Sequence, residues 1–465
     1  MTSPATSLAP VTATQRQLGT AAICLATLAQ PLDSSVNVAF PDIVNSFHLP
    51  IADIQWVVIA YTLTYAALML AAGRAGDLFG HRPIFLAGCA TGVLAFLFCT
   101  IAPTYGWLLA ARVLQGIAAA LTLSCGPALI TALYPDDQRT RALGLYTLIF
   151  GVGGALGPPI GGVLLQHWGW PSVYAFRVPI CAAALVLGFV LPRYSLRSGG
   201  RFDIAGAVLM VTAIAALLLA LNQLQHPDKI AIVIVLFVLF AALGTAFVLH
   251  QRRAAHPVVA LSYFRDADFS VLNIGHMGLN LAAFAFWLFV PFYLDRISGL
   301  SIVGVGVMLT IAPIGVAIAG SLAGRFARGM SAKQLALLGA VAVATGGAAI
   351  GSGHAGLIVI GLGSLVQGLG LGFYQVAYFD IATATLPAAD RGVAGSLVMM
   401  TRTLGIVIGA TVLTLVFQRF SIDAAANGAD AAATFVAGFD GAFRFAATLS
   451  AAVVVATLAR RWLRR

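Results

Sequence analysis

Asp33 and Arg112 are the residues of this sequence best placed to do chemistry, because each lies inside a long apolar stretch. A charged side chain is costly there, so each is by default a functional residue. The two enter their stretches to a similar depth, and a carboxylate–guanidinium pair is therefore expected. Such a pair could take up and release a proton, or it could be a permanent salt bridge. All sixteen acidic residues are Asp, and only Asp33 is deep enough to carry a proton through the middle of an apolar layer.

Polar side chains occupy one face of the stretch that holds Asp33. Gln30, Asp33 and Asn37 are spaced three and four residues apart, so they share one side of a helix. A later stretch has a similar face, formed by Asn273, His276, Asn280, Phe284 and Trp287. Two facing stripes of this kind predict a central cavity, and hydrogen bonding between helices is the alternative use of such residues. His276 could titrate near neutral pH, although a lone His on such a face is more often a packing residue.

The elements that hold these residues must be helices that use lipid as their solvent. Of the 465 residues, 60% are hydrophobic and 9% are charged, whereas soluble chains are about 45–50% apolar and about 25% charged. This composition excludes a soluble enzyme. Long apolar blocks without strict alternation favour helices over a β-barrel. The sequence has no P-loop, no HExxH and no credible nucleophile elbow, so we expect neither an enzyme nor a cofactor nor a metal site.

Apolar stretches of about 20 residues, bounded by Gly, Pro or charged clusters, predict fourteen membrane spans. They lie near residues 17–40, 53–73, 83–102, 107–133, 142–165, 172–192, 204–222, 229–249, 269–292, 302–324, 334–351, 355–379, 392–417 and 441–459. Lys and Arg concentrate in alternate loops, and positive residues are retained in the cytoplasm. Both termini are therefore predicted to be cytoplasmic.

An internal repeat divides the chain into two halves. A shift of 252 residues aligns Gln115-Gly116 with Gln367-Gly368, Pro135 with Pro387 and Arg139 with Arg391. The repeat predicts an all-α membrane protein of two six-helix bundles with an inserted helix pair. The predicted parts are a cytoplasmic tail (1–16), an N-terminal bundle (17–192), linkers with the inserted spans 7 and 8 (193–264), and a C-terminal bundle with a short basic tail (265–465). Parallel halves of this kind are a transporter architecture with the site between them.

The net charge of +10 does not indicate a nucleic-acid partner, because the basic residues are strung between apolar blocks rather than gathered on one face. The expected partners are a small-molecule substrate, protons and the lipid bilayer. The chain is expected to act as a monomer.

Short motifs occur in a fixed order along the chain. They are LDSSVNVAFP at residues 32–41, Trp56 with Tyr61, GRAGDLFGHR at 73–82, Arg112 with Gln115 and Gly116, GGALGPPIGG at 153–162, and FDIAG at 202–206. In type and order these motifs resemble those of the fourteen-span drug:proton antiporters of the major facilitator superfamily. The resemblance covers nearly the whole chain, and it implies a major facilitator fold. It also implies proton-coupled efflux of small amphiphilic compounds across the cytoplasmic (inner) membrane by alternating access.

The resemblance also implies roles for individual residues. Asp33 and Arg112 are expected to couple transport to protons. The expected substrate cavity comprises Gln30, Asn37, Trp56, Tyr61, Gln115, His276, Asn280, Phe284 and Trp287. The residues expected to gate the conformational change are Gly73, Asp77, Gly80, Arg82, Gly153, Gly157, Pro158, Gly161, Arg177, Asp380 and Arg402. Two alternatives stay open: an uncoupled or differently coupled exporter of a specific metabolite or lipid, and a membrane sensor or scaffold that transports nothing.

Three arginines make the predicted cavity less suited to cationic substrates. Arg177 stands where the family often has Asn, Arg402 lies within span 13, and Asp380 is the expected partner of Arg402. With Arg112, these guanidinium groups face a single deep carboxylate. This balance favours neutral, zwitterionic or anionic amphiphiles as substrates over dicationic drugs.

Overall fold

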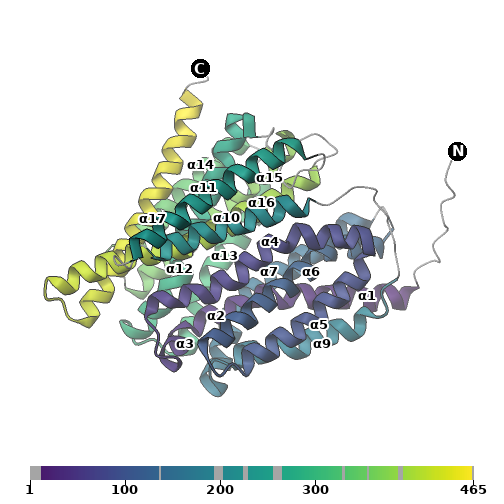
Figure 1. The fold of residues 1–465 in the computed structure, drawn as a ribbon, viewed down its shortest axis with the longest axis horizontal. Coiled ribbons are helices and arrows are strands. Elements are labelled where there is room, and N and C mark those ends of the chain that lie inside the picture. Colours follow the sequence, from purple (N-terminus) through teal and green to yellow (C-terminus); the bar gives the residue numbers. More distant parts are fainter. Residues whose placement is uncertain are drawn as a thin grey trace.

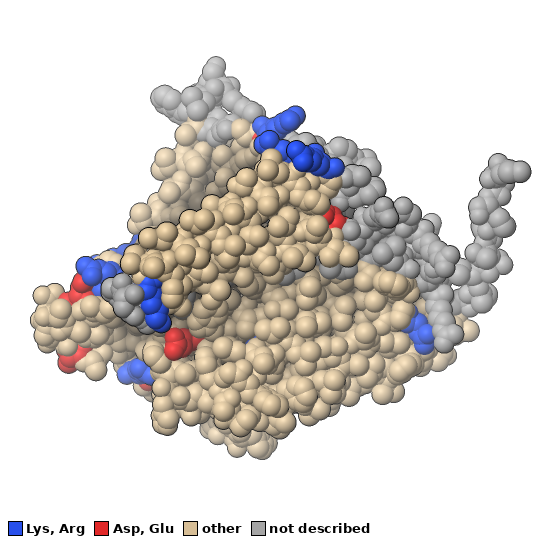
Figure 2. Space-filling view, viewed as in Figure 1, with Lys and Arg blue, Asp and Glu red and all other residues tan. Residues whose placement is uncertain are grey.

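The computed structural model describes residues 12–135, 138–192, 203–223, 229–254, 264–326, 330–352, 356–385 and 391–462. Every regular element in these ranges is a helix. A helix satisfies its backbone N–H and C=O groups within its own segment, which a lipid environment requires. On the face shown in Figure 2, charged side chains gather toward the edges and leave a broad uncharged surface between them.

The first half of the chain forms one bundle, drawn in purple and blue in Figure 1. Its elements are α1 (Ala13–Ala29), η1 (Pro31–Ser34), α2 (Ser35–Val38), α3 (Phe40–Ser46), η2 (Ile51–Ile54), α4 (Gln55–Phe79), α5 (His81–Thr100), α6 (Tyr105–Ala132), α7 (Arg139–Trp168), α8 (Ser172–Ala175) and α9 (Arg177–Gly188). The first predicted span is broken, because Pro31 lacks the N–H that would continue α1.

The second half forms another bundle, drawn in green and yellow, and two helices lie across the space between the bundles (Figure 1). The crossing helices are α10 (Ile204–Gln223) and α11 (Ile230–Arg253). The second bundle contains α12 (Ala267–Arg296), α13 (Ile302–Phe326), α14 (Ala332–Ile350), α15 (Leu357–Thr385), α16 (Arg391–Ala426) and α17 (Ala431–Trp462). α11 packs against α10, and α10 in turn contacts α4 of the first bundle and α16 of the second.

Ten helices in the described ranges are long and apolar enough to cross a membrane, or eleven if the bent pair Phe40–Ser46 and Ile51–Ala66 counts as one span. The sequence predicts fourteen. The difference arises at α1 and at α8 with α9, where a predicted span is interrupted, and at α10, of which only Ile204–Leu217 enters this count. Length and composition of continuous helices therefore support a multi-span helical fold without fixing the number at fourteen.

The motif at residues 73–82 is not the loop that the sequence predicts. α4 continues to Phe79 and α5 begins at His81, so Gly80 alone makes the turn. Its φ of 95° is accessible to Gly and strained for other residues. One turn later, Arg82 Nη2 donates a hydrogen bond to the carbonyl of Phe189 at 2.7 Å, which ties α5 to the end of α9. The side chain of Asp77 lies outside the described part of the chain.

Apolar packing differs between the two ends of the molecule. At one end a single core, which we call the shared core, contains side chains of both bundles, including Phe40 and Phe417. At the other end each bundle has its own core: one includes Phe85 and Leu129, and the other includes Leu335 and Tyr374. The bundles are therefore packed together at one end and separately packed at the other.

Helices α7 and α13 join the bundles on the side of the shared core. A β-carbon on Gly162 would lie 2.9 Å from the carbonyl oxygen of Ile302, and one on Gly306 would collide with the carbonyl of Pro158. Small residues let the two backbones approach this closely, as they do in packed membrane helices.

Candidate functional site

A cavity of about 620 Å³ lies between the two bundles. Its walls come from η1, α2, α4 and α7 on one side and from α12, α13, α15 and α16 on the other. Three charged side chains line it: Asp33, Arg112 and Arg402. Its volume is within the range of about 300–1,000 Å³ that is usual for small-molecule sites.

Asp33 is held by a bidentate pair with Arg112. Arg112 Nη1 donates to Asp33 Oδ1 at 2.6 Å, and Nη2 donates to Oδ2 at 2.8 Å. Two further donors reach Oδ1, namely Arg177 Nη1 at 2.7 Å and Gln115 Nε2 at 2.9 Å. The Asp33 side chain is 15% exposed, whereas those of Arg112 and Arg177 are 1% and 0% exposed. The carboxylate therefore faces the cavity, and the two guanidinium groups around it are almost fully buried.

Neighbouring groups fix both guanidinium groups in place. Arg112 Nε donates to the carbonyl of Val57 at 2.8 Å, and its guanidinium lies 4.6 Å from the ring centre of Tyr61. Arg177 Nε donates to the carbonyl of Val173 at 3.2 Å. Planar guanidinium groups favour such stacked and forked arrangements. The pair is thus built into the backbone of α4 and of the α8–α9 segment.

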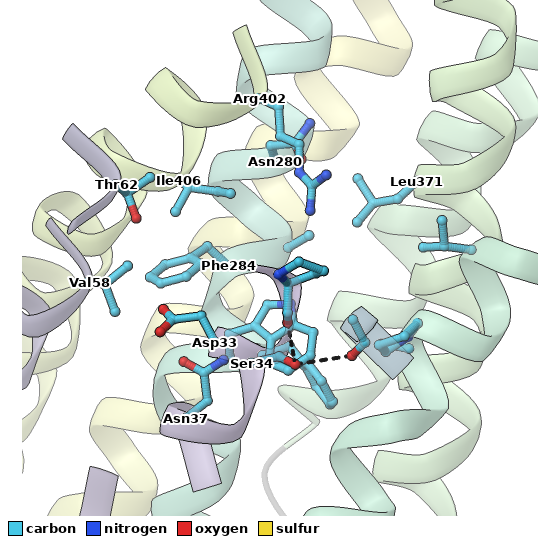
Figure 3. A pocket seen from close by; sticks show the side chains of 18 of the residues that line it. Asp33, Ser34, Asn37, Val58, Thr62, Asn280, Phe284, Leu371, Arg402 and Ile406 are labelled. Atoms are coloured by element: carbon cyan, nitrogen blue, oxygen red, sulfur yellow. Dashed lines mark hydrogen bonds between the residues drawn. The ribbon is translucent and has the colours of Figure 1, made fainter. Parts of the chain in front are cut away.

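The break in the first span sets the position of Asp33. η1 follows α1 directly, and the Asp33 N–H donates to the carbonyl of Gln30 at 3.0 Å. The next residue, Ser34, donates from its hydroxyl to the carbonyls of Pro31 and Gly154 at 3.0 and 3.1 Å. These two bonds are the dashed lines in Figure 3. η1 is thereby fastened to α7.

The glycines that recur every four residues in α7 receive this segment. A β-carbon on Gly153 would lie 2.6 Å from Pro31, and one on Gly161 would lie 2.8 Å from Ser35. Gly157 contacts Ser34 in the same way. α7 runs unbroken through Pro158 and Pro159. The motif predicted to gate thus forms the surface on which the Asp33 segment rests.

One carboxylate and two guanidinium groups leave this cluster with a net charge of +1. Donors from three side chains stabilise the ionised form of Asp33.

Six of the residues predicted to line the cavity do line it: Gln30, Asn37, Tyr61, Asn280, Phe284 and Trp287. Three others lie elsewhere in the described part of the protein. Trp56 packs against the shared core, and Gln115 is buried behind Asp33. His276 packs between helices, as the next paragraph describes. A role for these three in substrate binding stays a prediction.

His276 is a packing residue in this structure. It is 2% exposed, and its Nδ1 is 2.9 Å from the hydroxyl of Thr401. Its ring stacks on those of Tyr378 and Tyr374, with centres 5.0 and 6.1 Å apart. The imidazole therefore joins α12 to α15 and α16 rather than facing the cavity.

The predicted gating residues are spread over several places. Gly80 makes the α4–α5 turn, and Gly73 lies in α4 with Ser124 as its neighbour. Arg177 belongs to the Asp33 cluster. Asp380 is exposed near the end of α15, whereas Arg402 lines the cavity.

Sequence reasoning did not place several polar residues in the cavity. They are Ser34, Thr62, Tyr65, Gln367 and Gln375. Signals existed for two of them: Tyr65 follows Tyr61 by one helical turn, and Gln367 is the repeat partner of Gln115. Figure 3 shows that the guanidinium of Arg402 points into the cavity, with Phe284 between its level and that of Asp33 in this view.

Comparison with known proteins shows one family. The family model described as Major Facilitator Superfamily matches residues 23–410. The riboflavin transporter RibZ of Clostridioides difficile (strain 630) is 27% identical over 85% of this chain and 87% of its own. The multidrug resistance protein Stp of Mycobacterium tuberculosis (strain CDC 1551 / Oshkosh) is 30% identical over 81% and 71%. The tetracenomycin C resistance and export protein of Streptomyces glaucescens is 31% identical over 84% and 74%.

Solved structures share the fold. A bacterial homologue of the human lysosomal transporter Spinster, in an inward-facing and unoccupied conformation, superposes with a TM-score of 0.72 at 18% identity over 97% of this chain and 98% of its own. An auto-inhibited peptide transporter of the POT family gives 0.71 at 13% identity over 95% and 96%. At these identities the likeness concerns the fold alone.

Proposed function

Because this chain belongs to the major facilitator superfamily, whose members are membrane transporters and not enzymes, we propose that it exports small amphiphilic compounds in exchange for protons. The protein is a multi-pass membrane protein with a small-molecule substrate. One observation carries the proposal: a carboxylate held by two arginines forms part of the wall of a cavity between two helix bundles. Relatives named for multidrug resistance and for tetracenomycin C resistance and export support the direction and the class of compound.

Asp33 is the main proton carrier in this proposal. When the cavity faces outward, a proton binds one carboxylate oxygen and removes the negative charge that holds Arg112 and Arg177. As the bundles rock, the arginines approach again, favour the ionised carboxylate and displace the proton into the cytoplasm. Proton uptake and substrate release are coupled because both depend on the state of Asp33.

The present conformation is inward-facing in this proposal. The shared core closes the end that the distribution of Lys and Arg assigns to the outside, and the separate cores lie at the end assigned to the cytoplasm. Residues 17–192 would rock against residues 265–465. Both termini would then lie on the cytoplasmic side of the inner membrane.

Fourteen spans are the count that this topology requires. α1 with its broken continuation through α3 supplies one span, and α8 with α9 supplies another. α10 and α11 are the inserted pair. The remaining long helices supply one span each, and the chain would work as a monomer.

The gating residues act in this proposal by holding the first bundle together as one body while the bundles rock. Gly153, Gly157 and Gly161 hold the Asp33 segment against α7, so this segment moves with the first bundle. Gly80 and Arg82 fix the turn between α4 and α5.

A second candidate is a carrier for one metabolite. The match to the riboflavin transporter RibZ, which is 27% identical over 85% of this chain, favours it. A panel of fluorescent compounds that differ in charge and shape would separate the two, because a multidrug exporter moves several of them and a metabolite carrier moves one.

Replacement of Asp33 by Asn tests proton coupling. The Asp33→Asn protein, reconstituted in proteoliposomes, should bind compounds of the panel but lose transport driven by a pH gradient. Asp423→Asn is the matched control, because Asp423 is exposed and pairs only with the exposed Arg419 of the same helix among the described ion pairs. Gradient-driven transport at the wild-type rate in Asp33→Asn would disprove the role of Asp33.

A further inference from the structure

Arg402 is a second cationic group of the cavity, and the Asp33 cluster does not account for it. It projects from α16 into the cavity, as Figure 3 shows. Within the ranges that the structure describes, its guanidinium has neither an ion pair nor a hydrogen bond, and its electrostatic neighbours are the phenols of Tyr61 and Tyr65 and the imidazole of His276. A guanidinium keeps its charge in proteins and offers five N–H donors. An unpaired cation at this depth is costly unless a ligand completes it.

The charges of the cavity wall do not balance. Arg112 and Arg402 contribute two positive charges to the described lining, and Asp33 contributes one negative charge. Asp33 already accepts hydrogen bonds from Arg112 and Arg177, so its charge is neutralised on its own side of the cavity. The Asp33 cluster keeps a net charge of +1, and Arg402 adds a second positive charge that has no carboxylate of its own in the described lining.

Arg402 shares its cavity with other polar and aromatic side chains. Gln367 is 2% exposed and lines the cavity, and its Nε2 has no hydrogen-bond partner in the described structure. Gln30 lines the facing wall with the same exposure and has an unpaired Oε1. Buried polar groups of this kind normally find a partner. Phe284 and Trp287 add aromatic surface to the same cavity.

We propose that the transported compound is an aromatic monoanion whose carboxylate pairs with Arg402. Its ring system lies against Phe284 and Trp287, which line the same cavity. A single free guanidinium matches a single carboxylate in bidentate geometry. This assignment rests on the proposed export function, since it names the class of compound exported.

Three tricyclic probes of nearly equal shape test the assignment. Anthracenecarboxylate is anionic, anthracenecarboxamide is neutral, and aminomethylanthracene is cationic. Binding is measured by ligand fluorescence on purified protein in detergent, with no gradient present. The wild type should bind the carboxylate most tightly. Arg402→Gln should weaken that binding roughly 10- to 100-fold, the range for loss of a charge-assisted hydrogen-bonded pair. The affinity for the carboxamide should stay the same.

Two further variants keep the result interpretable. Arg402→Lys retains the charge without the fork and should retain part of the affinity. Arg419→Gln makes the same chemical change on α16 at a side chain that is 74% exposed, and it should alter nothing. The melting temperature of each variant reports whether it is folded.

Equal affinity of the wild type for the three probes, or unchanged carboxylate binding in folded Arg402→Gln, would overturn the assignment. That failure would leave proton-coupled export standing, because Asp33→Asn is tested by gradient-driven flux of a panel that includes cations. Conversely, normal gradient-driven flux in Asp33→Asn would refute the coupling while the binding preference set by Arg402 stood.

Discussion

The hydroxyl of Ser34 occupies the space that a β-carbon on Gly157 would need. This contact is one of a series in which the broken first span lies in a trough of α7 glycines. The position of the Asp33 carboxylate therefore depends on residues that have no polar side chain of their own.

A methyl group in this trough should displace the Asp33 segment. At Gly161 an added β-carbon would meet backbone atoms of Ser35 at 2.8 and 2.9 Å, which cannot rotate away. We expect Gly161→Ala to lower the free energy of unfolding by about 1–3 kcal/mol, the usual cost of overpacking, and to reduce transport. The measurement is the melting temperature in detergent together with gradient-driven flux.

Gly154→Ala is the control on the same helix. No atom lies within 4 Å of its added β-carbon, and Ala is a better helix former than Gly by about 0.5–1 kcal/mol. Its melting temperature should be unchanged or higher. A Gly161→Ala protein as stable as Gly154→Ala would show that the trough tolerates the methyl group.

Asp203 should make the attachment of the two inserted helices, α10 and α11, to each other sensitive to acid. Its Oδ1 accepts from the Gly206 N–H at 2.8 Å and lies 2.5 Å from His250 Nε2, while Oδ2 accepts from Gln251 at 2.6 Å. Burial raises the pKa of Asp203, but these hydrogen bonds outweigh burial and hold the pKa below its usual range. The stabilisation is therefore complete above the unfolded value of about 3.9 and is lost as the pH falls through the lower folded pKa.

Replacement of Asp203 by Asn should lower the melting temperature at neutral pH by several degrees, since hydrogen bonds to a charged group contribute about 1.5–3 kcal/mol. The difference from the wild type should shrink in strong acid, where both side chains are neutral. Thermal unfolding followed across a pH series measures this. A difference that is constant with pH would mean that the charge of Asp203 is not what stabilises the contact.

The charge of the exported compound decides how the membrane potential acts. If one monoanion leaves for each proton that enters, two elementary charges move in the direction that an inside-negative potential favours. Each is worth about 2.3 kcal/mol per 100 mV. A monocation exchanged for one proton would move no net charge.

We therefore expect a potassium diffusion potential, negative on the cytoplasmic side, to accelerate anthracenecarboxylate export in oriented proteoliposomes. Valinomycin sets the potential, and vesicles with equal potassium on both sides are the control. Export that ignores the potential would exclude the exchange of one monoanion for one proton.

The sequence predicts the clustering of Asp33, Arg112 and Arg177, because the rise per residue of a helix gives the depth of each side chain in the membrane. Counting residues from the span ends puts all three at about the same level, where opposite charges must pair. The sequence does not show that the break after α1 sets the position of Asp33. Pro31 alone does not indicate which helix the broken segment packs against.

His276 and Arg402 show what helical periodicity in the sequence does not predict. Spacing puts His276 on the same helix face as Asn280, but Tyr374 and Tyr378 cover it, and no local pattern predicts which neighbour covers which part of a face. For Arg402 the sequence suggests Asp380 as a partner, whereas in the structure Arg402 lines the cavity. Both outcomes depend on how distant helices dock, which is a tertiary property.

α10 touches both bundles, and α11 packs chiefly against α10. A rotation of one bundle against the other cannot preserve the contacts of α10 with α4 and with α16 at the same time. The inserted pair must therefore move with one bundle while its apolar surface slides along the other. The rate at which α10 exchanges these contacts, and not only the chemistry of Asp33, would then limit the turnover rate of the transporter.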